Sequence, residues 1–125
     1  MSNPTHITLS LSCDPHLARI VRMTAANVAT LSNMSVERVE DIRMAAEEAF
    51  IYACASTPGD SLSVSFDADD DHVTMSFQLD CDDFPAADEG DMTAAYADLI
   101  LGSVCDSFEK RSAPALLVLD LGADV

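Results

Sequence analysis

The fold is decided by the stretch Val39-Glu40-Asp41-Ile42-Arg43-Met44-Ala45-Ala46-Glu47-Glu48-Ala49-Phe50-Ile51-Tyr52-Ala53. Its apolar residues recur at helical spacing and predict one core-facing stripe, made of Val39, Ile42, Ala46, Ala49, Phe50 and Ala53. Met44 and Ile51 lie on the opposite side of this helix, and Glu48 and Tyr52 sit between them, one turn apart. A helix that only rests on a core is polar on that side. This helix is therefore expected to cover something else as well, either a ligand pocket or a protein partner.

The residues on either side of this stretch predict a strand, an earlier helix and clear helix ends. His6–Ser12 alternates apolar and polar side chains, as a half-buried strand does. Asp14 is a natural N-cap for a helix that runs to about Leu31. Ser35 is suited to cap the decisive helix, which must end near Thr57-Pro58-Gly59 because proline cannot continue it.

Beyond residue 60 the pattern changes to strands. Leu62–Phe66 and Val73–Leu79 alternate apolar with polar residues, and the acidic run Asp67–Asp71 is expected to join them as a hairpin. A third helix follows, with Asp91 as its cap. The residues expected on one side of that helix are Tyr96, Leu99, Ile100 and Val104. After a turn, Ala115–Leu121 is a last buried strand.

The predicted order of elements is β-α-α-β-β-α-β. Helices of this number on one face of a sheet make a two-layer sandwich. We therefore expect an α+β fold with a mixed four-stranded sheet and three helices on one face. No linker or internal repeat divides the chain, so residues 1–125 are expected to form a single domain.

The charge of the chain is large and unevenly placed. The formal net charge is −16. Residues 1–56 carry four Arg against six acids, a net of −2, whereas residues 57–125 carry two basic residues against sixteen acids, a net of −14. Such a surface repels nucleic-acid backbones and anionic lipid, so direct nucleic-acid and membrane partners are disfavoured. The charge is compatible with a basic protein partner, although solubility alone is the commoner reason for exposed acids.

Two further features of the sequence indicate the cellular compartment of the protein. No uncharged stretch reaches the roughly 20 residues that span a bilayer, and the N-terminus lacks the regions of a signal peptide, so we expect a cytoplasmic protein. The cysteines form no Cys-x-x-Cys pair, and they predict ordinary thiols rather than zinc ligands or disulfides. They are Cys13, Cys54, Cys81 and Cys105.

The segment Glu40–Ala53 also resembles the first ATP-site motif of the GHKL (histidine-kinase-like) ATPases. The closest form is that of the anti-sigma factor serine-protein kinases. Their helix reads acid, acid, aliphatic, basic, and then Glu-Ala-x-x-Asn-Ala. The strand and the helix before the motif fit as well, so the resemblance covers residues 5–55. It implies a GHKL, or Bergerat-like, fold, and the predicted order of elements agrees with a minimal domain of that kind.

The resemblance implies roles for two residues of the motif helix. The family's glutamate acts as general base toward the hydroxyl that is phosphorylated, and Glu48 matches that position. The family's asparagine, four residues later, holds Mg²⁺, and Tyr52 stands in its place. A phenol is a poor ligand for magnesium, which requires compact hard oxygens in octahedral geometry. The metal anchor is therefore expected to be lost.

Two loops of the family's nucleotide site are altered as well. In the Asp-x-Gly-x-Gly loop that binds adenine, Leu79 or Asp80 takes the aspartate position, both glycines are missing, and Phe84 matches the final aromatic. In the Gly-x-Gly loop that binds phosphate, Ala95 and Ala97 replace the glycines. The lid, about Pro85–Met92, is very short. With three of four elements altered, we expect no cofactor; ATP and Mg²⁺ are expected only if the site still functions.

The leading hypothesis is an anti-sigma-factor-like regulatory domain that acts by binding protein in bacterial transcription or stress signalling. It would be an inactive relative of a serine-protein kinase, and Glu48 a relic of its base. The resemblance implies a sigma factor or an anti-sigma antagonist as partner, and it implies homodimers. The expected contact residues are Arg19 and Arg22 of the first helix and the outer side around Met44, Ile51 and Tyr52.

Two alternatives stay open. One is an active anti-sigma serine-protein kinase that binds ATP and Mg²⁺ through an unorthodox site with Glu48 and Asp80. The other is a signalling subunit that only homodimerises. A metal site is not expected: Asp67, Asp69 and Asp71 have the first spacings of a calcium-binding EF-hand, but the loop lacks its glycine and its final glutamate.

Overall fold

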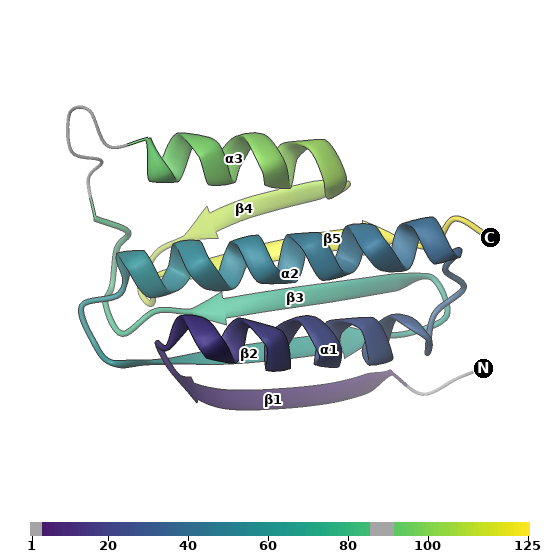
Figure 1. Ribbon diagram of the computed structural model, residues 1–125, viewed down its shortest axis with the longest axis horizontal. Coiled ribbons are helices and arrows are strands. Elements are labelled where there is room, and N and C mark those ends of the chain that lie inside the picture. The colour runs from purple at the N-terminus through teal and green to yellow at the C-terminus, as the bar shows by residue number, and fades with distance from the viewer. Residues whose placement is uncertain (1–3, 86–91) are drawn as a thin grey trace.

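The computed structural model describes residues 4–85 and 92–125. Over these residues the chain forms two layers, a sheet and a set of helices that all lie on one face of it (Figure 1). The strands are β1 (Thr5–Ser12), β2 (Ser61–Ala68), β3 (His72–Gln78), β4 (Ser107–Arg111) and β5 (Leu116–Gly122). The helices are α1 (Ala18–Ala29), α2 (Val36–Ser56) and α3 (Thr93–Val104), and a short 3-10 helix, η1 (Pro15–Leu17), leads into α1.

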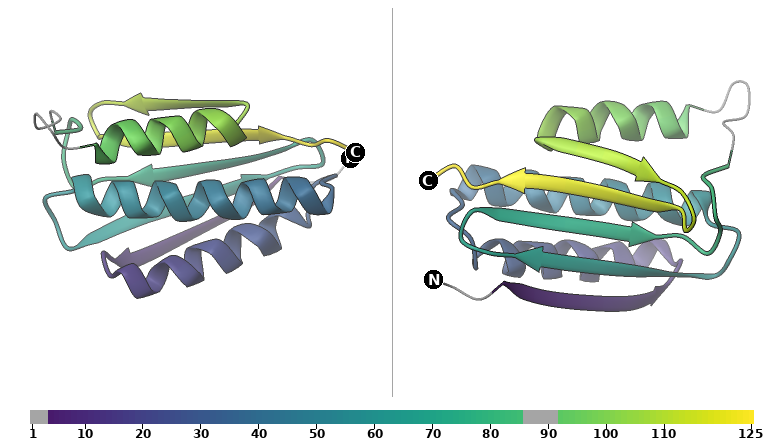
Figure 2. Two further views of the ribbon diagram at one scale, coloured as in Figure 1. Left: turned by 45° about the horizontal axis from the view of Figure 1, so that its top comes forward. Right: turned by 180° about the vertical axis from the view of Figure 1, so that it is seen from behind.

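Every strand pairs antiparallel with its neighbours, in the order β1-β2-β3-β5-β4. The view from behind in Figure 2 shows the uncovered face of this sheet, with the helices beyond it. The predicted α+β class and the three helices on one face are confirmed. The two alternating segments are confirmed as β2 and β3, joined by a short acidic turn.

The sheet differs from the prediction in two linked ways. The described residues form five strands rather than four, and the sheet is antiparallel rather than mixed. The added strand is β4, which the sequence conceals because Glu109, Lys110 and Arg111 make it highly charged, as edge strands often are. Without β4, the strand after the crossover helix α3 would run parallel to β3. Because β4 turns the chain once more, β5 runs antiparallel to β3.

The core lies between the two layers. The buried sheet residues are Leu62, Val64 and Phe66 of β2, Val73, Met75 and Phe77 of β3, and Leu117, Leu119 and Leu121 of β5. From the helix side, α2 contributes the predicted stripe except Val39, which is only half-buried. Phe50 is its largest buried member, and burying such a ring stabilises the fold by roughly 1.5–3 kcal/mol.

The predicted ends of the first two helical segments are confirmed. The Asp14 carboxylate accepts a hydrogen bond from the His16 amide at 2.9 Å and caps η1, from which α1 continues. The Ser35 hydroxyl accepts one from the Arg38 amide at 3.1 Å, and α2 ends with Thr57 as its C-cap. These polar side chains satisfy amide groups that the first turn of a helix leaves without partners.

The core side of the third helix is not the one that carries Tyr96 and Leu99. Its buried residues are Ala97 and Leu101, whereas Tyr96 and Leu99 are 60% and 69% exposed. Tyr96 and Leu99 therefore do not mark the core side of α3, which is formed by Ala97 and Leu101. The predicted cap, Asp91, lies outside the described residues.

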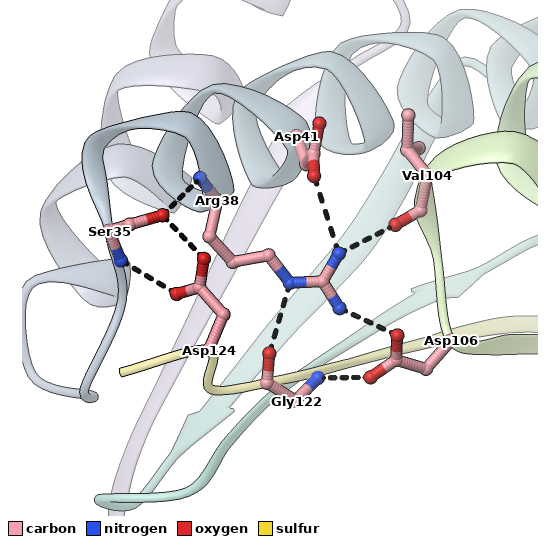
Figure 3. A network of polar contacts seen from close by, with 7 residues as sticks. All are labelled: Ser35, Arg38, Asp41, Val104, Asp106, Gly122 and Asp124. Carbon is pink, nitrogen blue, oxygen red and sulfur yellow. Dashed lines mark hydrogen bonds and ion pairs between the residues drawn. The ribbon is translucent and has the colours of Figure 1, made fainter.

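The first turn of α2 is fixed by Arg38, whose guanidinium joins three segments of the chain (Figure 3). It donates hydrogen bonds to the carbonyl oxygens of Gly122 and Val104, each at 3.0 Å, and to the Asp106 carboxylate at 2.7 Å. Asp41 accepts a further one at 3.3 Å. Burial of Arg38 opposes its charge, but the hydrogen bonds to Asp106 and Asp41 outweigh that effect and raise its pKa.

Two carboxylates complete this Arg38 network. Asp106 accepts a hydrogen bond from the Gly122 amide at 2.6 Å, and this bond together with Arg38 lowers the pKa of Asp106. Asp124 accepts from the hydroxyl and the amide of Ser35, and both bonds lower the pKa of Asp124. A β-carbon at Gly122 would lie 2.9 Å from the Asp106 carboxylate, so glycine permits this approach. The network ties the start of α2 to the ends of α3 and β5 (Figure 3).

Candidate functional site

The far half of α2 carries Tyr52, which is only 5% exposed. Its ring stacks on that of Phe84, with ring centroids 5.9 Å apart and planes within 4°. The Lys110 ammonium lies 4.8 Å from the Tyr52 ring centroid and 5.7 Å from that of Phe84. Stacked rings attract each other, and the face of a ring attracts a cation. This aromatic cluster, Tyr52, Phe84 and Lys110, joins α2 to the segment after β3 and to β4.

Lys110 also connects the cluster to α3. Its ammonium donates a hydrogen bond to the Tyr52 hydroxyl, and it forms an ion pair with Asp98 at 3.1 Å. Burial opposes the charge of Lys110, but the bonds to Tyr52 and Asp98 outweigh it and raise the pKa of the ammonium. Sequence reasoning missed Lys110 and Asp98, because nothing links them until β4 is known to lie beside α3.

Burial shows which of Leu79 and Asp80 is placed to take the aspartate position after β3. Leu79 is 2% exposed and belongs to the core, so the exposed Asp80 is the residue of the two that lies at the surface. The Asp80 amide donates a hydrogen bond to the Thr57 hydroxyl at 2.9 Å. A β-carbon at Gly59 would lie 2.6 Å from the Asp80 carboxylate. Asp80 therefore packs closely against the turn that follows α2.

Ala95 and Ala97 lie in the first turns of α3, which corrects their placement in a phosphate-binding loop. The Tyr96 amide donates a hydrogen bond to the Met92 carbonyl at 2.8 Å, so helical bonding has begun before Ala97. Ala97 is buried in the core, whereas Ala95 is exposed. Alanine is the best helix former, which explains a helix where glycines would favour a loop. Most of the predicted lid, Pro85–Met92, lies outside the described residues.

Glu48 differs from the other acids of the helical layer. Partial burial, and then the neighbouring Glu47, raise the pKa of Glu48. The other acids beyond the first turn of a described helix each pair with a cation, in the pairs Glu40–Arg43, Asp41–Arg38, Glu47–Arg22 and Asp98–Lys110. Over residues 4–85 and 92–125, the Glu48 side chain makes no hydrogen bond or ion pair. It therefore carries a partly desolvated charge that is not compensated within the described chain.

The residues predicted to meet a partner mostly lie at the surface. Met44 and Ile51 are 52% and 44% exposed on α2, and Arg19 is exposed on α1. Arg22 is partly buried and forms an ion pair with Glu47 of α2 at 3.3 Å. Tyr52 is a correction: it was grouped with the outer side of α2, but it is buried in the aromatic cluster. At 100° per residue, Tyr52 points away from Ile51 and toward α3.

The outer sides of the other two helices carry apolar residues that the sequence did not single out as surface. Ile20 and Met23 of α1 and Tyr96 and Leu99 of α3 are exposed. With Met44 and Ile51 they make up what we call the outer helical surface. Two shallow hollows of about 330 and 300 Å³ are lined in part by Arg22 and lie between α1 and α2. Where exposed apolar side chains form a large contiguous patch, they mark a surface that binds protein.

The remaining candidate, the acidic turn between β2 and β3, is held by its own backbone. The Asp69 carboxylate accepts hydrogen bonds from the amides of Asp71 and His72, each at 2.8 Å, and these bonds lower its pKa. In the described part of the chain, no three His, Cys, Asp or Glu side chains are grouped to hold a metal ion. Among the helices described, none combines the length and the hydropathy needed to cross a bilayer.

Comparison of the sequence with models of known protein families, and with characterised proteins, found no significant match.

Proposed function

We propose that this protein is a regulatory domain that works by binding another protein, in the manner of an anti-sigma factor, and that it has lost the ATP site of that family. The observation that carries the proposal is the exposed ridge of α2, where Met44 and Ile51 flank the unpaired Glu48. This helix is also the one whose sequence resembles the family. The partner, by the same resemblance, is a sigma factor or an anti-sigma antagonist.

The chemistry of the ridge defines what the partner must offer. Aliphatic or aromatic side chains would cover Met44 and Ile51, and a Lys or Arg would compensate the desolvated Glu48. Arg19, which has no ion-pair partner among the described residues, adds a site for an acid nearby on α1. An amphipathic helix with basic residues among apolar ones has this composition. The net charge of −16 draws such a partner and repels nucleic acid.

Loss of the ATP site is supported by the aromatic cluster. Tyr52 takes the position of the family's metal-holding asparagine, and it is stacked on Phe84 and bonded to Lys110. These contacts occupy the side chain that a magnesium site would need. The helical Ala95 and Ala97 also lack the flexible backbone that cradles phosphate. Phosphoryl transfer depends on positioned phosphates and metal, whereas protein binding does not.

The test is a binding titration with purified candidate partners, namely the sigma factors and antagonist proteins of the same genome. We expect one of them to bind with a dissociation constant of micromolar or tighter, and Ile51→Asp to weaken that binding at least tenfold. The matched control is Val36→Asp, which places the same acid at an 80% exposed apolar residue of the same helix. Equal losses for the two variants, or no binding by any candidate, would contradict the proposed surface.

A second titration, with ATP and Mg²⁺, separates the proposal from an active kinase. We expect no saturable binding at nucleotide concentrations up to about 1 mM. Saturable micromolar binding that is lost in Glu48→Gln or Asp80→Asn would instead support the kinase alternative. The two variants change exposed or half-exposed side chains, so circular dichroism should show that both fold as the wild type does.

A further inference from the structure

Three polar side chains on the open face of the sheet are joined in a line. The His6 Nδ1 atom lies 2.6 Å from the Asp67 carboxylate, and the His6 Nε2 atom lies 3.1 Å from the Thr8 hydroxyl. An ionised carboxylate only accepts hydrogen bonds, so the proton of the neutral ring lies on Nδ1, and Nε2 accepts from the Thr8 hydroxyl. The order carboxylate, imidazole, hydroxyl is that of a nucleophile activated by a general base. We call Asp67, His6 and Thr8 the relay.

The relay follows from the register between β1 and β2, which lie side by side in the view from behind in Figure 2. His6 lies opposite Asp67, and Thr8 lies opposite Ser65. Side chains that oppose each other across antiparallel strands have β-carbons about 5 Å apart, close enough for these hydrogen bonds. Side chains two residues apart on a strand share a face, and the exposed His6 and Thr8 both point away from the helical layer. The relay is therefore open to solvent.

Ser65 of β2 adds a second hydroxyl beside the nucleophile. Its oxygen lies 3.4 Å from that of Thr8. The Thr8 hydroxyl has one proton, which it donates to His6, so Ser65 is the donor in this contact. Attack on a carbonyl carbon turns the carbonyl oxygen negative, and a hydrogen-bond donor next to the nucleophile stabilises that oxygen. The Ser65 hydroxyl is in the position to be this donor.

Other histidines and hydroxyls of the chain lack this combination of partners. The His16 Nδ1 atom lies 3.0 Å from the Asp14 carboxylate, but no described hydroxyl bonds to the other nitrogen of that ring. The Thr74 hydroxyl donates directly to the Asp120 carboxylate at 3.1 Å, with no imidazole between them. Within the described part of the chain, only His6 connects a carboxylate to a hydroxyl. The general base and the nucleophile are therefore assigned by contacts, and not by composition.

The surface beside the relay favours a small, uncharged substrate. A shallow hollow of about 230 Å³ lies next to it, lined in part by Ser10 and Ser63, the cross-strand pair that follows the Thr8 pair along the sheet. Serine hydroxyls and the Gln78 side chain give this hollow hydrogen-bonding groups, and Asp80 is its only charged side chain. The net charge of −16 repels anionic acyl donors such as acyl phosphates.

The geometry points to an acyl-transfer site at which Thr8 is the nucleophile and His6 is the general base. The Thr8 oxygen attacks the carbonyl carbon of a small uncharged ester, while its proton passes to the His6 Nε2 atom. The bond between the carbonyl carbon and the alcohol oxygen then breaks, and the alcohol leaves with the proton from His6. Thr8 keeps the acyl group as an ester. Asp67 is a positioning residue, because it holds the ring in the tautomer that can accept the proton.

This site does not depend on the proposed partner surface. The relay lies on the open face of the sheet, whereas Met44 and Ile51 belong to α2, on the other face (Figure 2). The partner titration and an acylation assay therefore measure opposite sides of the molecule. Failure of one proposal leaves the result for the other unaffected.

Acetylation of the full chain by p-nitrophenyl acetate, a small uncharged ester, tests the site. Peptide mass spectrometry over time measures the rate at which each hydroxyl gains an acetyl group. We expect Thr8 to be acetylated about a hundredfold faster than Ser10, the gain typical of a general base. Ser10 is a strict internal control, since it is exposed on the same face of the same strand and has the less hindered hydroxyl. Acetylation of Thr8 no faster than that of Ser10 would overturn the proposal.

Variants of the two paired histidines test the general base. His6→Gln should lower the rate at Thr8 to that at Ser10. His16→Gln is the matched control, because it removes the other carboxylate-paired imidazole, and it should leave the rate unchanged. Thr8→Ser keeps a hydroxyl beside His6 and should still be acetylated at this position. All three changes are at exposed side chains, and circular dichroism checks that the variants fold. Equal losses in His6→Gln and His16→Gln would contradict the assignment of His6.

Asp67→Asn tests the positioning role with a spectroscopic readout. The amide of asparagine can donate to Nδ1 of His6, which moves the ring proton to Nε2 and leaves no acceptor for the Thr8 hydroxyl. Nitrogen NMR of the imidazole should show the proton on Nδ1 in the wild type and on Nε2 in the variant. The acetylation rate at Thr8 should fall with that change. A wild-type ring with its proton on Nε2, or a variant that keeps the wild-type rate, would overturn the proposal.

Discussion

The two ends of α2 are attached to the rest of the protein by different physical means. At its start, Arg38 and Asp106 bind backbone groups of Val104 and Gly122 in a polar network (Figure 3). In its far half, Tyr52 is held by a stacked ring and a cation over its face. Both attachments reach α3 and the strands after it. One relies on directional hydrogen bonds, and the other on buried area.

This difference indicates which end of α2 tolerates substitutions. A guanidinium that binds fixed backbone carbonyls allows few substitutions, because its partners cannot be altered by mutation. Contacts between rings tolerate other side chains of similar size. The end that the family resemblance assigns to the nucleotide is thus the end held by adaptable contacts. The polar end keeps α2 in place whatever happens at the other.

The largest expected effect comes from breaking the polar end. Arg38→Met should lower the free energy of unfolding by about 3 kcal/mol, because two carboxylates and two carbonyl oxygens lose their donor. Arg38→Lys keeps the charge but not the planar fork, and it should cost about half as much. Urea denaturation measures both. If Arg38→Met were as stable as the wild type, the network would not be what holds this end of α2.

Much of the fold follows from sequence patterns that act locally. The alternation of β2 and β3, the caps at Asp14 and Ser35, and the stop at Pro58 each depend on a few adjacent residues, and each agrees with the structure. β4 was missed because its residues have the composition of a solvated turn. Missing one strand also reversed the expected direction of β5, so a local omission became an error of topology.

The site was less predictable, because its contacts join distant parts of the chain. Tyr52 and Phe84 were singled out through the resemblance, but their stacking was not, and Lys110 gave no signal at all. The Arg38 network spans up to 89 residues and includes main-chain carbonyls, which sequence does not distinguish. Nothing in the sequence indicated that Tyr96 and Leu99 of α3 lie at the surface, and only the neighbouring elements reveal that Ala97 and Leu101 face the core.

The next largest effect should come from the aromatic end. Tyr52→Asn introduces the residue that the family uses, and it should lower the free energy of unfolding by about 2–3 kcal/mol, because it removes a buried ring that stacks on Phe84. Tyr52→Phe keeps the ring and loses only the bond from Lys110, for a cost of about 1 kcal/mol. Thermal and urea unfolding measure both variants. Equal costs for the two would mean that the hydroxyl, rather than the stacking, secures this end.

The smallest of these effects on the free energy of unfolding depends on pH. It is expected at the polar end of α2, which contains carboxylates that titrate, and not at the aromatic end. The pKa of Asp106 is lowered in the folded state by the Gly122 amide and by Arg38, so its contribution to stability is complete above the ordinary carboxylate pKa of about 4. That contribution is lost as the pH falls through the lowered value, where the folded carboxylate also takes up a proton. Asp106→Asn should therefore cost about 1 kcal/mol at pH 7 and progressively less below pH 4.

Asp82→Asn is the control for this pH series, since it removes the same charge from an exposed side chain after β3. Removing a charge from so acidic a protein relieves general repulsion, and this variant measures that effect alone. Urea denaturation at several pH values between 3 and 7 should show the cost of Asp106→Asn, relative to Asp82→Asn, vanish at the acid end. A cost that stayed constant with pH would mean that the shape of Asp106, and not its charge, supports the polar end of α2.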